Sequence, residues 1–165
     1  MSLHELRESL RLNEECYREL LDLAQQKKES IVNDRLNDLT LIMTKESRLL
    51  KKIAEAEQMR TQAVLSFQQA AGLQREKPLT LTEVARISTN PEDKADIRMR
   101  IERLSELTGK LKEMNELNQS LTRQALDFVE LSLDLLMGVP DEAVYRIPTQ
   151  APAPTGRKGA YDFKA

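Results

Sequence analysis

The chain has 165 residues, the usual size of a single domain. It lacks tryptophan and is 4% aromatic, while charged residues of both signs make up 32% and leave a net charge of −2. This composition suits long helices that pack along narrow seams, and it excludes a nucleic-acid-binding protein, which would carry a basic face.

The first residues and the single cysteine indicate the compartment. Acidic residues come early and no apolar core follows them, so the N-terminus is not a signal peptide. No apolar run approaches the roughly 20 residues of a membrane-spanning helix. Cys16 has no partner for an internal disulfide, and we expect it to be a small buried hydrophobic residue. We therefore expect a cytoplasmic protein without membrane insertion.

A first helix is predicted over about residues 2–31. Ser2 and Glu5 form a capping box, and Met1 and Leu6 are placed as its hydrophobic staple. Apolar positions then recur at spacings of three and four, which is a heptad pattern with one polar interruption. The seam comprises Leu3, Leu6, Leu10, Asn13, Tyr17, Leu20 and Ala24.

A second helix is predicted over about residues 35–71. Asn33 and Asp34 before it supply either a turn or a new N-cap. Gly72 stands at the C′ position of a Schellman ending, in which Leu73 folds back on Phe67. The seam comprises Leu36, Leu39, Met43, Glu46, Leu50, Ile53, Glu57, Arg60, Val64, Phe67 and Ala71.

A short helix over residues 80–87 follows a loop. Thr80 and Glu83 form its capping box, with Leu79 and Val84 as the staple.

A third long helix is predicted over residues 91–137. Asn90 serves as N-cap, and Gly138 ends the helix. Gly109 lies inside it and suggests a slight bend or a close helix contact. The seam comprises Ile97, Ile101, Leu104, Thr108, Leu111, Asn115, Asn118, Thr122, Ala125, Val129, Ser132 and Leu136.

These elements predict an all-α fold, an elongated antiparallel three-helix bundle or coiled coil with a short extra helix. The short turn at Asn33 makes the first two long helices antiparallel, and the longer connection lets the third join them. Residues 1–138 form the bundle, and residues 139–165, rich in proline and glycine, form a flexible tail. The tail holds half of the aromatic residues, namely Tyr145, Tyr161 and Phe163.

Residues for catalysis or metal binding are missing from the sequence. His4 is the single histidine, which excludes a histidine-based triad and a two-histidine metal cage. No glycine-rich phosphate loop is present. We interpret Glu46, Glu57 and Arg60 on the second seam as polar pairs that fix register. The chain is therefore not expected to be an enzyme or to carry a cofactor.

Two features of the third long helix could bind a partner. Asn115 and Asn118 either set the register of the bundle or make polar contacts with a partner helix. Further along, apolar residues cover more than one helical face, which a single seam cannot bury. That end either closes the bundle or binds another chain. Its apolar residues are Ala125, Leu126, Phe128, Val129, Leu131, Leu133, Leu135, Leu136 and Met137.

The chain resembles the FlgN-type flagellar export chaperones over about residues 3–145. The resemblance rests on the heptad first helix and on the segment NDRLNDLTLIMTKESRLLKKIAEAEQMR. It also rests on KLKEMNELNQSLTRQALDFVELSLDLL, in which Asn115 and Asn118 precede a leucine-rich end, and on Tyr145 shortly after it.

The resemblance implies a chaperone that binds the terminal helices of hook–filament junction proteins in the cytoplasm. Such a chaperone prevents premature assembly and delivers its clients to the flagellar type III export gate. The family's client-binding region corresponds to Leu121–Tyr145, and its gate-docking tyrosine to Tyr145, with Tyr161 as a second candidate. The client-binding candidates are Asn115, Asn118, Leu121, Leu126, Phe128, Val129, Leu131, Leu135 and Leu136.

The heptads leave an alternative open. A self-associating coiled-coil structural or adaptor protein, such as a homodimer, would show the same patterns.

Overall fold

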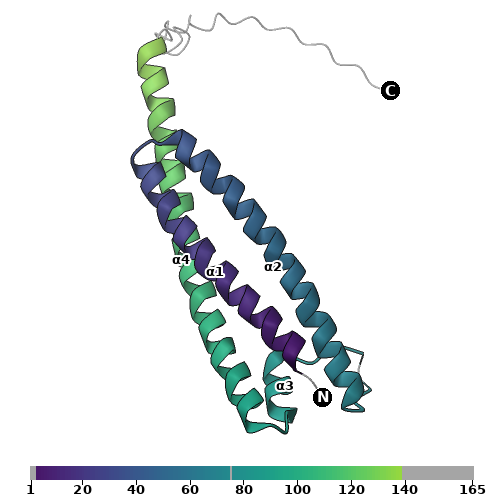
Figure 1. The fold of residues 1–165 in the computed structure, drawn as a ribbon. Helices are drawn as coiled ribbons and strands as arrows, with labels where there is room; N and C mark the ends of the chain where they lie inside the picture. The colour runs from purple at the N-terminus through teal and green to yellow at the C-terminus, as the bar shows by residue number, and fades with distance from the viewer. Residues whose placement is uncertain (1–2, 75, 139–165) are drawn as a thin grey trace, which may run out of the picture. The chain divides into compact units, whose positions relative to one another are not determined.

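The computed structural model describes residues 3–74 and 76–138, which form four helices and no strand (Figure 1). The helices are α1 (His4–Val32), α2 (Leu36–Ala70), α3 (Leu81–Ile87) and α4 (Pro91–Met137). The all-α class expected from the sequence is thus confirmed. The chain divides into two units after Phe128, within α4, and each unit is described by itself below.

The turn between α1 and α2 is closed by Asn33. Its backbone N–H and its Nδ2 both donate to the carbonyl oxygen of Glu29, at 3.0 and 2.8 Å. Asp34 follows with φ of +53°, the left-handed conformation that Asp tolerates better than most residues. Arg35, and neither Asn33 nor Asp34, occupies the N-cap position of α2, and it makes no side-chain cap hydrogen bond. Asn33 and Asp34 therefore form a turn and do not cap the helix.

Two of the expected helix starts are confirmed, and a third lies partly outside the described residues. The backbone N–H of Thr80 donates to Glu83 at 2.8 Å, and that of Glu83 to the Thr80 hydroxyl at 3.3 Å, which completes the capping box of α3. Asn90 accepts from the backbone N–H of Glu92 at 2.9 Å at the start of α4. The capping box and staple expected for α1 depend on Met1 and Ser2, which lie outside the described residues.

The end of α2 is a Schellman motif. Gly72 has φ of +68°, and its N–H donates to Gln69 at 3.0 Å. The N–H of Leu73 donates to Gln68 at 3.1 Å, and Leu73 packs against the core cluster that contains Phe67. This ending turns the chain toward α3.

A first core cluster joins all four helices. α3 contributes Val84 and Ala85, and the staple residue Leu79 before it is also buried. The other buried members are Leu3, Leu6, Leu10, Ala63, Val64, Phe67 and Ile97. At this end of α2, therefore, α3 serves as a fourth helix.

A second core cluster is built mainly by α1 and α2. Its buried members are Cys16, Leu20, Leu23, Ile42, Leu49 and Ile53, and α4 adds only the half-buried Leu111. Burial raises the pKa of the Cys16 thiol, and the nearby Glu19 raises it further. The thiol therefore stays protonated near neutral pH, as expected of a residue that packs rather than reacts.

Ion pairs set α4 parallel to α1. Arg7 contacts Asp93 at 3.2 Å and Asp96 at 2.9 Å, while Arg100 contacts the buried Glu14 at 3.5 Å. Residue numbers rise together along the two helices, so they run in the same direction. The sequence patterns did not single out Glu14, because it lies one position from the seam residue Asn13.

The polar seam positions of α2 pair as expected. Asn13 donates to Glu57 at 2.7 Å, and Arg60 donates to the same carboxylate at 2.8 Å. Lys27 donates to Glu46 at 2.9 Å. These contacts link α1 to α2 at two levels and fix their register.

The seam predicted for α2 is wrong in its first half. Leu36, Met43 and Leu50 are 73%, 53% and 58% exposed, while Ile42 and Leu49 are buried instead. The reason is that α2 carries two adjacent apolar stripes here. α1 covers the stripe of Ile42 and Leu49 and leaves the other one open.

Gly109 of α4 does not mark a close helix contact, since a Cβ placed there would meet nothing within 4 Å. We therefore expect Gly109→Ala to raise the free energy of unfolding by roughly 0.5–1 kcal/mol, because alanine restricts the unfolded chain. Urea denaturation measures the change. Ala54→Gly on the exposed face of α2 is the control and should lower stability by a similar amount. A destabilised Gly109→Ala variant would show that this position needs glycine.

Candidate functional site

An open groove lies between α2 and α4, with α1 as its floor. Its volume is about 660 Å³. α1 contributes Leu20 and Lys27 to it. The other lining residues are Leu39, Met43, Glu46 and Leu50 of α2 and Leu111, Asn115, Asn118, Gln119, Thr122, Arg123 and Leu126 of α4. We call it the α2–α4 groove. All of its lining residues belong to the first unit.

The two asparagines expected to bind a client differ in their surroundings. Asn118 is only 4% exposed, and its Nδ2 donates to the carbonyl oxygen of Ala24 at 2.8 Å. This hydrogen bond ties α4 to α1 and favours the register interpretation for Asn118. Asn115 is exposed on the groove wall, where a partner could reach it.

The remaining candidates in the first unit lie along the same part of α4. Leu121 is half-buried and does not line the groove, whereas Leu126 lines it and is largely exposed. Phe128 is also largely exposed. The structure therefore brings Asn115, Asn118 and Leu126 together in one groove, with Leu121 outside it.

The described part of the second unit, residues 129–138, holds the apolar end of α4. Leu135 and Leu136 are 78% and 84% exposed. Val129, Leu131, Leu133 and Met137 are exposed as well. We use "apolar end" for residues 129–137 from here on. The tail candidates Tyr145 and Tyr161 lie outside the described residues.

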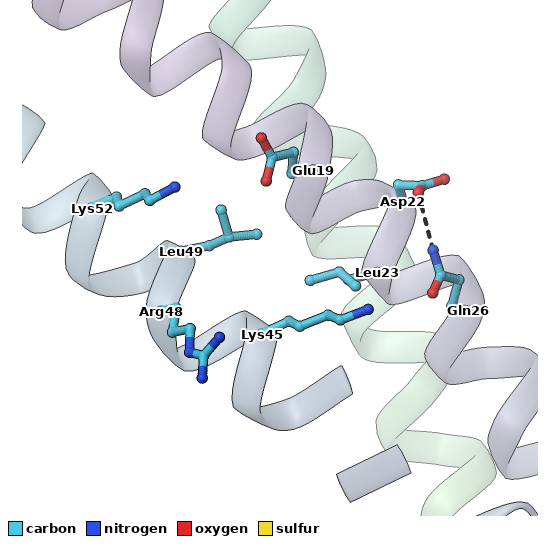
Figure 2. A pocket seen from close by; sticks show the side chains of 8 residues that line it. All are labelled: Glu19, Asp22, Leu23, Gln26, Lys45, Arg48, Leu49 and Lys52. Carbon is cyan, nitrogen blue, oxygen red and sulfur yellow. Dashed lines mark hydrogen bonds between the residues drawn. The ribbon is translucent and has the colours of Figure 1, made fainter. Parts of the chain in front are cut away.

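A second cleft, of about 330 Å³, separates α1 from α2 (Figure 2). Figure 2 shows Lys45, Arg48 and Lys52 on α2 across from Glu19 and Asp22 on α1. The two walls carry opposite charges, which attract each other across the cleft. This balance gives little reason to assign the cleft to a charged ligand.

Within residues 3–74 and 76–138, no group of histidine, cysteine, aspartate or glutamate side chains could hold a metal ion. None of the helices in the same ranges combines the length and hydropathy that a membrane crossing requires. The surfaces that stand out in the described chain are thus the α2–α4 groove and the apolar end, and both suit protein binding.

The groove was not predicted as such, although its signal is present in the sequence. Along α2, apolar residues occupy two neighbouring stripes, and a helix apolar on two faces needs two partners. The heptad spacing places Leu39, Met43 and Leu50 on the bundle seam, whereas in the structure they line the groove.

Comparison with known proteins gives two findings. The family model described as "FlgN protein" matches residues 1–151. An uncharacterized protein, YvyG of Bacillus subtilis (strain 168), is 29% identical over 147 residues, which cover 88% of each chain. No solved structure is significantly similar.

We predict that the two asparagines respond differently to truncation. Asn118→Ala removes a buried donor and should lower the free energy of unfolding by about 1–2 kcal/mol. Asn115→Ala, on the exposed wall, should change it by less than about 0.5 kcal/mol. Chemical denaturation of both variants makes the comparison. Equal small effects would contradict a structural role for Asn118.

Proposed function

We propose a function from the premise that the chain belongs to the FlgN family of flagellar export chaperones. The chain binds hook–filament junction proteins in the cytoplasm. It holds their terminal helices, prevents their premature assembly and delivers them to the flagellar type III export apparatus.

The observation that carries this proposal is the exposed apolar end of α4. Large apolar side chains there, such as Leu135 and Leu136, face water in the free chain. Contiguous exposed apolar surface usually marks a binding site. Proteins that polymerise through terminal helices must expose an amphipathic stripe before assembly, and a helical surface of aliphatic side chains can cover that stripe.

Client binding is assigned to α4 in both units. In the second unit the contacts come from Val129, Leu131, Leu135 and Leu136. In the first unit they come from Asn115, Leu126 and Phe128. Asn118, which ties α4 to α1, and the half-buried Leu121 hold this part of α4 in place for the client. The contacts are apolar and polar but not covalent, so the client can leave the chaperone intact at the export gate.

Docking at the export gate is assigned to Tyr145, with Tyr161 as the second candidate. We expect Tyr145→Ala to reduce binding to the purified cytoplasmic domain of the gate while client binding stays unchanged. Tyr161→Ala serves as the comparison, and surface plasmon resonance measures both. Gate binding that survives both substitutions would remove the tyrosines from this role.

We predict that Leu131→Asp combined with Leu135→Asp abolishes client capture. Both side chains are exposed, so the helix should persist and circular dichroism should be unchanged. The lost apolar contact and two new charges should weaken binding at least 100-fold. Pull-down and calorimetry with purified junction proteins measure the effect.

The matched control is Ser120→Asp combined with Gln124→Asp. It adds the same charge at the same spacing on exposed positions of α4 that do not line the groove. The control should bind clients normally. If the Leu131 and Leu135 variant does so too, the apolar end is not the client site.

A further inference from the structure

We propose that the α2–α4 groove is a second contact site for the client, and that one amphipathic client helix fills it to complete a four-helix arrangement. This inference rests on the proposed chaperone function and adds the α2 wall of the groove to the client contacts already assigned to α4. The residues that carry it are Leu39, Met43 and Leu50 on one wall and Asn115 and Leu126 on the other.

The wall formed by α2 has the spacing of a helix-packing seam. Leu39, Met43, Glu46 and Leu50 follow one another at intervals of four, three and four residues. This is the a/d spacing that receives the side chains of a neighbouring helix. Met43 and Leu50 are more than half exposed, so the described chain supplies no helix for them.

The wall formed by α4 has the same spacing. Leu111, Asn115, Asn118 and Thr122 recur at intervals of four, three and four residues, and all of them line the groove. Leu111 and Asn118 of this row also contact α1, so the part of α4 that stays open beside the α2 wall is Asn115, Thr122 and Leu126. A helix that places its side chains between the two rows fits their spacing. Asn118 also favours a bound partner, because its buried Oδ1 has no hydrogen-bond donor among the described residues and an occupant of the groove could supply one.

The other end of the first unit shows how this fold fills such a space. There α3 packs Val84 and Ala85 into a cluster with residues of α1, α2 and α4. Val64 and Phe67 of α2 are buried in that cluster, whereas Met43 and Leu50, which line the α2–α4 groove, are exposed. One end of the first unit thus has a fourth helix packed onto it, and the groove has none among the described residues.

The groove also defines the chemistry of its occupant. Its walls run over residues 39–50 and 111–126, about 17–22 Å of helix, which corresponds to three or four turns. Lys27 and Glu46 neutralise each other at 2.9 Å. Arg123 forms no ion pair within the described ranges and leaves the lining with one uncompensated positive charge. The occupant therefore carries an aliphatic stripe flanked by a carboxylate that reaches Arg123.

The test uses the full-length chain and fluorescently labelled peptides that span the terminal helices of the junction proteins. Met43→Glu combined with Leu50→Glu should weaken peptide binding about 30-fold or more, because burial of two large apolar side chains is lost and two charges are added. Both positions are exposed, so folding should be unaffected. Leu41→Glu combined with Leu65→Glu, on exposed positions of α2 outside the groove, is the matched control and should bind normally.

A photo-crosslinking residue adds a measurement that does not depend on affinity. Placed at Met43 it should capture the peptide, and placed at Leu41 it should not. Arg123→Glu should weaken binding, and a peptide in which the matching acidic residue is changed to lysine should restore it.

Each contrary outcome has a distinct meaning. Peptide that binds the wild-type chain and the Met43 and Leu50 variant equally overturns the groove site and leaves the chaperone function standing. A wild-type chain that binds none of the peptides overturns both proposals. If the variant instead converts a dimer to a monomer by light scattering with unchanged peptide affinity, the groove holds a second copy and the client site is overturned.

Discussion

The structure of the first unit depends on α1, which packs against both α2 and α4. α1 packs against α2 through Leu20 and Leu23 and against α4 through the Glu14–Arg100 ion pair and the Asn118–Ala24 hydrogen bond. Its own seam is consequently almost fully buried. Neither α2 nor α4 can bury a second stripe against α1, since that surface is already occupied. The exposed stripes of both helices follow from this constraint.

Uncovered apolar surface is costly to a folded protein, and here it is localised. α3 covers one end of the first unit, whereas the α2–α4 groove has no cover among the described residues. The apolar end of α4 adds a second exposed surface in the other unit. A protein whose task is to hold an amphipathic helix needs surface of this kind before its client arrives. The same surface needs no catalytic group, which agrees with membership of a chaperone family.

Much of the fold could be predicted from local signals. The Thr80–Glu83 capping box, the Gly72 ending and the seam of α1 each rest on a few adjacent residues, and each is confirmed. The α2 seam failed in its first half because two apolar stripes compete there, and sequence spacing does not say which one α1 will cover. Glu14 was missed because its partners Arg100 and Arg103 are distant in sequence. The groove depends on three helices at once, so no single pattern could reveal it.

The most direct test of the account is amide hydrogen exchange of the full-length chain, alone and saturated with a purified junction protein. If the uncovered stripes are the client surface, binding should slow exchange in residues 39–50 of α2 and in residues 111–137 of α4. The end of the bundle that α3 covers should exchange as before. Protection confined to the α3 end, or no change in α2 and α4, would contradict the claim that these stripes await a client helix.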